Sequence, residues 1–557
     1  MSSELENPLS SEQEVQSTEK PVEKEETMEE DKKSQDADKE DEDMADTTVD
    51  QTINTTMDTT ANTTAASTTK TPSKKGRGRP KRTAEKKTDE PVKEKDSAPR
   101  GGGRKRKTSE GSGGGSAPTT PRKGKAAKVT LTLSWEDFVS KELGDRVLSC
   151  GDGEPLGHPG RTTSKKPRKV DIVEEEEMKI RQVVAGGVHS MILTDDHRVF
   201  ACGINEKGTV PAEGVEPEGS TDEFTEIKLN ELIPDMEQNH GKVVMLTAGA
   251  SFSAAVTDLG SVIAWGNLRD SSGEVDAHPQ LKQMTKKPVV VINHKKLKIV
   301  KVAAGENHLA MLSEHGHMYT FGEGSMGQLG RTRRTGHIRG RFMADDSGEQ
   351  LLVKVSIKWK DVLFKNIFAA GYWTAAISTD DVVYTFGLNN YGHLGEAPPQ
   401  DQTDYHVYKP TIAPAYEGRK YTHLVGVQHI AARSDDGEVY AIGRNVDNAL
   451  GLGTWTGNDD DEHWRYTTMQ HVEGLPSGKI AGMSATLGAT IAWSEDGKAW
   501  SWGFDTSGQL GLGIKDDDDK MVPKPTEITS AHLDGYRILS VAVADNHSLF
   551  LAKKVSE

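Results

Sequence analysis

Histidines at one place in a repeated pattern are the first residues that could do chemistry. Three of them end a glycine-containing loop and open an apolar run: His189, His308 and His547. An imidazole at such a junction can contact a partner or hydrogen-bond a neighbouring repeat. We place His429 one residue early in its own repeat and expect it to project differently and contact a partner. Phe252 and Trp373 hold the equivalent position elsewhere, so the sequence predicts no metal cluster there.

Charged residues gather in two insertions between repeats. The first, Asn267–Gly273, carries an Arg-Asp pair at an expected hairpin tip. The second, Arg331–Arg341, is strongly basic. Arginine guanidinium groups match clustered carboxylates, so Arg339 and Arg341 are the side chains best suited to an acidic partner. A solvated loop is the plainer alternative for both insertions.

Motifs of covalent catalysis are missing from the chain. It contains no Gly-x-Ser-x-Gly elbow, no His-Glu-x-x-His helix and no phosphate-binding loop. We therefore expect a binding protein that uses no cofactor and no metal ion, and that is not an enzyme of the bond-making kind.

The repeats are the elements that must position these residues. In Val302–Arg331, apolar residues alternate over Leu309–Ser313 and Met318–Phe321 on either side of a Glu-His-Gly turn, which predicts a β-hairpin. A glycine ends the second strand of each copy: Gly151, Gly203, Gly266, Gly322, Gly387, Gly443 and Gly503. Spacings of 52 to 65 residues between these glycines suit one four-stranded blade plus a loop.

The two ends of the array are incomplete in a complementary way. Val147–Gly151 lacks the Gly-His strand before it, and Val541–Lys554 lacks the second strand after it. We therefore predict an all-β fold: a closed seven-bladed β-propeller over residues 129–557 whose first and last repeats share a blade. Antiparallel strands put the loop before the first strand and the loop after the second at one end. The histidines, Arg331 and the Asn267–Gly273 loop should ring that face.

The N-terminal tail divides by charge. Residues 1–50 hold 19 Asp and Glu against 5 Lys, residues 51–69 are Thr-rich, and residues 70–128 hold 20 Lys and Arg against 6 Asp and Glu. Such polar blocks cannot bury a core, so we expect residues 1–69 and 70–128 to be disordered. The total net charge of −17 leaves about −16 on the ring.

Within the basic block, Arg77-Gly78-Arg79-Pro80 resembles an AT-hook. Gly78 has no side chain to clash with the floor of the A·T minor groove, and the flanking arginines favour its negative potential. A basic localisation signal gives similar letters and remains the alternative. Residues 104–107, Arg-Lys-Arg-Lys, are a candidate nuclear-import signal.

Compartment follows from what the chain lacks. No apolar run approaches the length of a membrane span, and the acidic N-terminus is unlike a secretory signal. The two cysteines, Cys150 and Cys202, hold equivalent positions in adjacent blades, too far apart for a disulfide. We expect buried thiols in an intracellular protein.

The repeated unit Ala-Gly-x-x-His…Asp-Gly-x-Val-Tyr-x-x-Gly…Gly-Gln-Leu-Gly resembles the regulator of chromosome condensation family over residues 129–554. The insertion Asn267–Gly273 is similar to that family's β-wedge. The resemblance implies guanine nucleotide exchange on the small GTPase Ran, by distortion of the GTPase's nucleotide site. It places the chain on chromatin in the nucleus as a monomer, producing Ran-GTP for nuclear transport, spindle assembly and nuclear envelope formation.

The resemblance also implies roles for single residues. Arg269, Asp270, Ser271 and Gly273 would form the wedge, with Asp270 acting on the phosphate-binding lysine or magnesium region of Ran. Arg269 could instead anchor the wedge by a salt bridge. The Ran-contacting set would be His189, Asn307, His308, Arg331, His429 and His547. Arg339 and Arg341 would contact nucleosome core histones, and a nuclear import receptor would bind the tail. Acidic residues common on these loops in the family are replaced here by Ala250 and Asn307.

Two other functions compete with exchange. A chromatin-bound propeller scaffold would share the ring and the tail but would need no wedge. A ring-shaped redox enzyme would need a channel rich in metal ligands, which the repeats do not provide.

Overall fold

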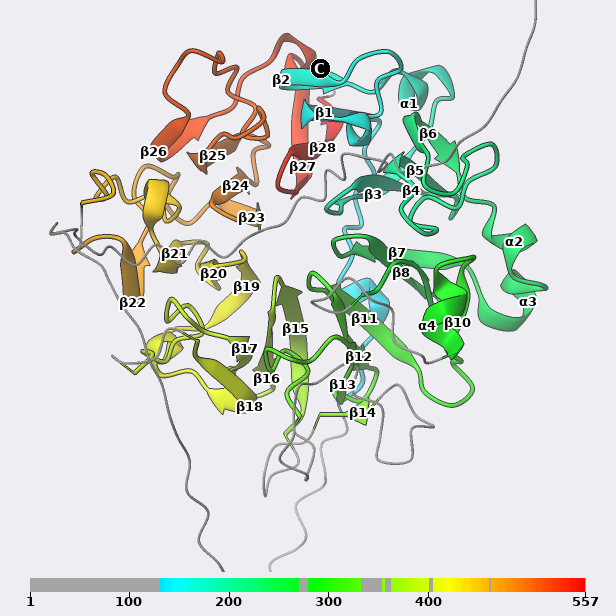
Figure 1. Cartoon of the computed structure of the whole chain (residues 1–557), viewed down its shortest axis with the longest axis horizontal. Coiled ribbons are helices and arrows are strands. Elements are labelled where there is room, and N and C mark those ends of the chain that lie inside the picture. The colour runs from blue at the N-terminus through cyan, green and yellow to red at the C-terminus, as the bar shows by residue number, and fades with distance from the viewer. Residues whose placement is uncertain are drawn as a thin grey trace, which may run out of the picture. The chain divides into compact units, whose positions relative to one another are not determined.

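The computed structural model describes residues 131–269, 279–331, 353–355, 362–399, 404–459 and 462–555. Within this part, seven four-stranded antiparallel sheets surround a central channel (Figure 1). The predicted seven-bladed β-propeller is confirmed. The tail segments, the Asp270–Gly273 part of the wedge, Arg339 and Arg341 lie outside the described residues.

Each of the first three complete blades takes its strands in chain order from the channel outward. Blade 1 is β3 (Ile180–Ala185), β4 (His189–Thr194), β5 (Val199–Ile204) and β6 (Ser220–Glu226). Blade 2 is β7 (Val243–Ala248), β8 (Phe252–Thr257), β9 (Val262–Gly266) and β10 (Val289–Ile292). Blade 3 is β11 (Ile299–Ala304), β12 (His308–Ser313), β13 (Met318–Gly322) and β14 (Val353–Lys354).

Blades 4 to 6 repeat the same order. Blade 4 is β15 (Phe364–Ala370), β16 (Trp373–Ser378), β17 (Val383–Leu388) and β18 (His406–Ile412). Blade 5 is β19 (Tyr421–Val425), β20 (His429–Ser434), β21 (Val439–Arg444) and β22 (Arg465–His471). Blade 6 is β23 (Ile480–Ala485), β24 (Ala489–Ser494), β25 (Ala499–Phe504) and β26 (Met521–Glu527).

Blade 7 joins the two ends of the ring. It is ordered β27 (Tyr536–Val543), β28 (His547–Lys554), β1 (Arg146–Asp152) and β2 (Thr163–Lys169). Val147 lies opposite Leu551, and Gly151 lies opposite His547. The shared blade predicted from the complementary ends is therefore confirmed. The blades begin at Arg146, so residues 131–145 precede the ring's first strand and form no blade.

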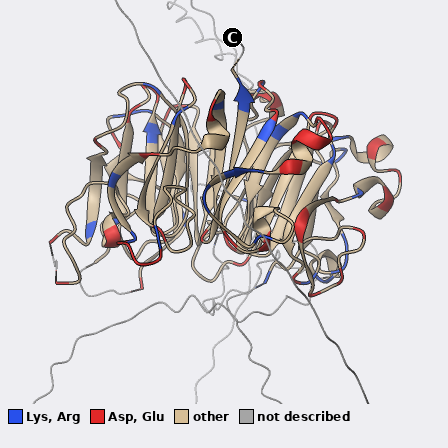
Figure 2. Cartoon of the chain, turned by 90° about the horizontal axis from the view of Figure 1, so that it is seen from above, with Lys and Arg blue, Asp and Glu red and all other residues tan. Residues whose placement is uncertain are grey.

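Short helices and 3-10 turns lie before β1 and in the connections between strands. The α-helices are α1 (Asp171–Glu175), α2 (Leu229–Leu232), α3 (Met236–His240) and α4 (Pro279–Met284). The 3-10 turns are η1 (Trp135–Asp137), η2 (Glu154–Leu156), η3 (Pro414–Tyr416), η4 (Val446–Asn448) and η5 (Ala531–Leu533). In the side view the strands carry few charged residues, whereas Asp and Glu gather in loops and helices (Figure 2). No described helix has the length and apolarity of a membrane span.

The hydrophobic core lies between the blades. Every residue of β4, β8, β12 and β16 is buried, because both faces of these strands pack against neighbouring sheets. Tryptophans fill the larger spaces: Trp265, Trp373 and Trp502 are fully buried. Cys150 and Cys202 are free and buried as predicted, and burial raises the pKa of both thiols.

The glycine that ends each second strand has a steric reason. Gly203 has φ of 116°, a region that favours glycine, and a Cβ there would lie 2.4 Å from the carbonyl oxygen of Val188. Gly322 has the same φ, and its Cβ would lie 2.7 Å from the carbonyl oxygen of Asn307. The loop before β4 thus passes directly against the end of β5, and the loop before β12 passes against the end of β13.

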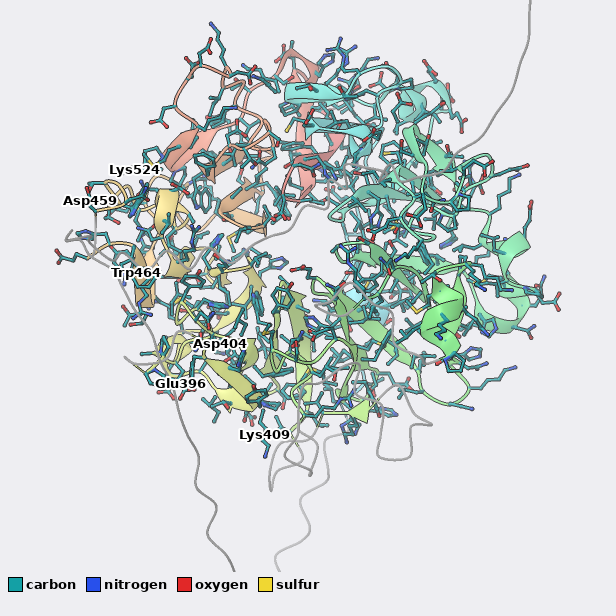
Figure 3. All side chains as sticks on the ribbon, in the orientation of Figure 1. Glu396, Asp404, Lys409, Asp459, Trp464 and Lys524 are labelled. Carbon is teal, nitrogen blue, oxygen red and sulfur yellow. The ribbon has the colours of Figure 1, made fainter. Side chains whose placement is uncertain are left out.

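The outer edges of the blades carry lysine and proline. Lys409 on β18 and Lys524 on β26 lie at the rim of the ring (Figure 3), each followed by a proline. Proline removes a backbone donor and lysine resists burial, so both protect an exposed strand edge from pairing with another chain. Ring closure alone does not remove these edges.

Candidate partner-binding face

The loops of one channel end meet where the sequence predicted. His189, His308 and His547 lie opposite Gly203, Gly322 and Gly151 in their hairpins. The loop that leads into each histidine and the loop that follows each of these glycines therefore share one end of the ring, as the antiparallel geometry requires. We call this end the histidine face.

The position of His429 corrects the sequence analysis. His429 begins β20 and lies opposite Gly443, the same register that the other three histidines have. The residue is not one position early, and its side chain is buried like theirs. The prediction that His429 projects differently is therefore wrong.

The four histidines link neighbouring blades. Each Nε2 hydrogen-bonds a hydroxyl on the second strand of the next blade: His189 to Ser253 at 2.6 Å, His308 to Thr374 at 2.8 Å, His429 to Thr490 at 2.9 Å and His547 to Ser190 at 2.9 Å. The inter-blade hydrogen bond that we gave as the alternative is confirmed. The rings are fully buried, so they support the histidine face from beneath rather than forming its surface.

Burial keeps these imidazoles neutral. It lowers the pKa of His189 and of His429 to about 4, and the pKa of His308 and of His547 to about 3. A charged ring would lose its hydration without gaining a carboxylate partner, which is why the neutral form is favoured.

Two of the blades that lack this histidine have an aromatic residue in its place. Trp373 donates its Nε1–H to the carbonyl oxygens of Gly426 and Val427 in the next blade, at 3.1 and 3.2 Å. Phe252 fills the same position in blade 2 without a polar atom.

The start of the predicted wedge is anchored to blade 1. Arg269 Nη1 lies 2.5 Å from Glu206 Oε1, and the side-chain amide of Asn267 donates to the same oxygen at 2.7 Å. Ser251 Oγ donates to the other carboxylate oxygen at 2.6 Å. The salt bridge suggested for Arg269 is confirmed. It holds the base of the Asn267–Gly273 loop on the histidine face, between blades 1 and 2.

Arg331 lies against its own blade. Its guanidinium donates to the carbonyl oxygen of Thr320 on β13 at 3.2 Å, and burial lowers the pKa of Arg331 to about 10. The backbone carbonyl of Asn307 accepts a hydrogen bond from Glu323 at 2.8 Å, and its side chain is buried. Both residues therefore brace blade 3 at the histidine face.

Acidic groups that the sequence analysis missed lie on this face. Glu306 and Asp545 each stand two residues before a blade-linking histidine, and Glu323 follows β13. Burial raises the pKa of Glu306, with smaller raising effects from Asp545 and Glu323. Tyr372 donates to Glu306 at 2.8 Å. An acidic residue two residues before the histidine was the signal available in the sequence. These carboxyl groups supply acidity that Ala250 and Asn307 do not.

Recurrent side chains hold the glycine-rich loops rigid. The side-chain oxygens of Asn205, Asn389 and Asn445 accept the backbone N–H five residues on, at 3.0, 2.9 and 3.2 Å. Buried hydroxyls donate to the carbonyl oxygen of the leucine in the Gly-x-Leu-Gly motif, each at 2.8 Å: Thr320, Thr385 and Ser501. Ser149 donates in the same way to Leu156, at 2.7 Å, in a loop without the first glycine of that motif. The loops are thereby fixed before any partner binds.

The described residues contain no group of three His, Cys, Asp or Glu side chains arranged to hold a metal ion. What the histidine face offers is a rigid, partly acidic surface with an anchored loop at one side. Such an arrangement suits the binding and deformation of another protein.

Comparisons with known proteins show which family the chain resembles. The RCC1-like domain matches residues 146–550. The human regulator of chromosome condensation is 31% identical over 434 residues, covering 76% of this chain and 90% of that protein. The Saccharomyces cerevisiae guanine nucleotide exchange factor SRM1 is 25% identical over 419 residues, covering 71% and 83%. Yeast RCC1 (Prp20), solved bound to Kap60, has a TM-score of 0.66 at 23% identity, covering 79% and 97%.

The protein is therefore a seven-bladed propeller built from RCC1-like repeats, with a rigid, partly acidic face at one end. The chain belongs to the regulator of chromosome condensation family.

Proposed function

We propose that this chain is a guanine nucleotide exchange factor for the small GTPase Ran. The observation that carries the proposal is the Asn267–Gly273 loop, fixed at its base by Glu206 on the rigid histidine face of a chain that belongs to this family. The proposal includes attachment to chromatin in the nucleus, where Ran-GTP would serve nuclear transport, spindle assembly and nuclear envelope formation.

Exchange needs a difference in affinity rather than a reaction. A factor that binds the empty GTPase more tightly than the loaded one must, by linkage, weaken the bound nucleotide. The ion pair between Arg269 and Glu206 lets the loop transmit force to Ran, because its base cannot yield. Asp270, Ser271 and Gly273 would then enter the nucleotide site, with Asp270 competing for its lysine or disturbing its magnesium.

The acidic groups would position Ran. Asp545 is exposed and Glu306 is half-buried near it, so together they present negative charge at the channel mouth. Complementary charge speeds encounter and sets orientation more than it adds affinity. The buried residues His189, His308, His429 and His547, together with Asn307 and Arg331, would hold these loops in place.

Release of a fluorescent nucleotide from Ran tests the proposal. The parent should accelerate release of either GDP or GTP without a cofactor of its own. Arg269→Ala and Asp270→Ala should lower the maximal rate, while Glu306→Gln and Asp545→Asn should mainly raise the Ran concentration needed. Arg198→Ala, at the other end of blade 1, is the matched control and should change neither.

Two results would decide against parts of this assignment. If the wedge variants keep the parent's maximal rate, the loop is only a solvated tip. If the parent releases no nucleotide while still binding nucleosomes, the chromatin scaffold is the better function.

A further inference from the structure

The segment before β1 lies at the ring end opposite the histidine face, where it contacts the turn between β12 and β13. In Figure 1 this blue-to-cyan segment runs from beside β11 past β7 and β3 toward β1. It comprises residues 131–145, of which Trp135–Asp137 form η1. Ser134 and Asp137 cap that turn reciprocally, so the segment has a defined shape of its own.

One anchor of this segment is on blade 3. Leu133 donates its N–H to the carbonyl oxygen of Glu314, in the turn between β12 and β13, at 2.8 Å. Phe138 packs against the cores on both sides of blade 3, and its ring lies 5.3 Å from Lys301 Nζ on β11. Leu131 lies against Gly316 in the same turn.

The second anchor is on blades 7 and 1. Glu142 accepts two hydrogen bonds from Arg537 of β27, at 2.5 and 2.6 Å. Gly144 exchanges hydrogen bonds of 2.9 Å with Ile180 of β3. A Cβ at Gly144 would lie 2.3 Å from Leu551 Cδ1, so the backbone presses directly on β28.

The two anchors matter because of how blade 7 closes the ring. Arg146 begins β1 and lies opposite Ala552, near the end of β28. A pull on Arg146 away from β28 would break the β1–β28 hydrogen bonds one after another. Opening a ladder one bond at a time needs less force than breaking all its bonds together.

We propose that residues 131–145 form a strap that delivers any pull on the N-terminal tail to blade 3 and so shields the strand pairing that closes the ring. Along the chain, residues 131–145 come between the tail and Arg146, the first residue of β1. A load on the tail first meets the Leu133 and Phe138 contacts, then the Glu142 ion pair, and reaches β1 last. A tail tethered to a large partner would therefore not open the ring from its weakest edge.

Force spectroscopy on the full chain tests the strap. Handles attached through Ser116→Cys and Ser556→Cys load the tail against the C-terminus, with the natural thiols Cys150 and Cys202 buried. The parent should show a first extension before blade 7 opens, and this step should be shorter than about 50 Å, the length of 15 extended residues, because the folded strap already spans part of that length. The double variant Phe138→Ala with Glu142→Ala should lose that first step, and blade 7 should open at lower force. Lys141→Ala, an exposed change within the strap, should behave as the parent.

The result is checked against loss of folding. Hydrogen exchange in β19–β22 should be the same in the parent and in the double variant, because blade 5 has no contact with the strap among the hydrogen bonds and ion pairs described. If the parent opens blade 7 without a preceding step, or if the double variant opens it at the parent's force, the strap carries no load and the proposal is overturned. Faster exchange in every blade of the double variant would also overturn it, because the change would then act on the whole ring.

Discussion

Acid should unfold this ring through its buried histidines. Burial lowers the pKa of the four blade-linking histidines to about 3 or 4 from an ordinary value of 6.5. Three more histidines share this property: buried His158 at about 4, buried His393 at about 3 and half-buried His423 at about 4. Between the folded and unfolded pKa values the unfolded chain binds more protons, so stability falls as pH falls from about 6.5 toward about 4.

The magnitude follows from that difference. Moving from about pH 7 to about pH 5.5 protonates most of each histidine in the unfolded chain and almost none in the folded ring, which costs about 1.2 kcal/mol per residue. The four blade-linking histidines together cost about 5 kcal/mol, which is a large share of the ~5–15 kcal/mol that stabilises a typical fold. The raised pKa values of Glu306 and Asp505 oppose this trend.

Denaturant unfolding at several pH values measures the effect. His308→Gln and His429→Gln keep an amide donor near Thr374 and Thr490 but cannot titrate. Each should remove about 1.2 kcal/mol of the loss between about pH 7 and about pH 5.5. His315→Gln, in the exposed turn between β12 and β13, removes no link between blades and serves as the control for the substitution itself. If the His308→Gln and His429→Gln double variant keeps the parent's full pH dependence, the rings are not buried in the neutral form and the reasoning fails.

The remaining predictions concern the tail and the basic insertion. Arg77→Ala with Arg79→Ala should weaken binding to A·T-rich DNA and flatten the salt dependence of that binding in a titration. With two fewer cationic side chains on the DNA, binding releases fewer counterions. An unchanged salt slope would favour a localisation signal alone. Arg339→Ala with Arg341→Ala should weaken nucleosome binding but not naked-DNA binding in a gel-shift assay. Equal loss on both substrates would show that the insertion contacts DNA rather than histones.

Much of the fold could be predicted because its repeats obey one steric rule. Gly203 and Gly322 stand where the preceding loop leaves no room for a Cβ, so glycine marks every blade. The complementary ends then require a shared blade. The strap could not be predicted, because a single segment has no repeat to reveal its contacts.

The candidate site was harder to predict, since its side chains act across repeats. His429 follows Gly426 by three residues, as His189 follows Gly186 and His308 follows Gly305, so its register with the other histidines was visible in the sequence. A separation of 61 to 66 residues joins each of His189, His308 and His429 to its hydroxyl partner. That spacing matches the repeat length, so it was visible in the sequence as a histidine followed one repeat later by Ser or Thr. The role of this spacing was not visible, because only the packing of the blades shows that the imidazole side chains point into the protein.

The inward histidines bear directly on the proposed exchange mechanism. A surface can distort its partner only if it is stiffer than the partner. The free energy of docking then deforms the partner and not the propeller. Neutral, buried links between blades and fixed Gly-x-Leu-Gly loops give the histidine face that stiffness without using charge. In the proposed mechanism, exposed Asp545, half-buried Glu306 and the loop anchored by the Arg269–Glu206 pair would act on Ran. Exchange should therefore depend on the surface charges, and ring stability on the buried imidazoles, so the two sets of variants should separate in their effects.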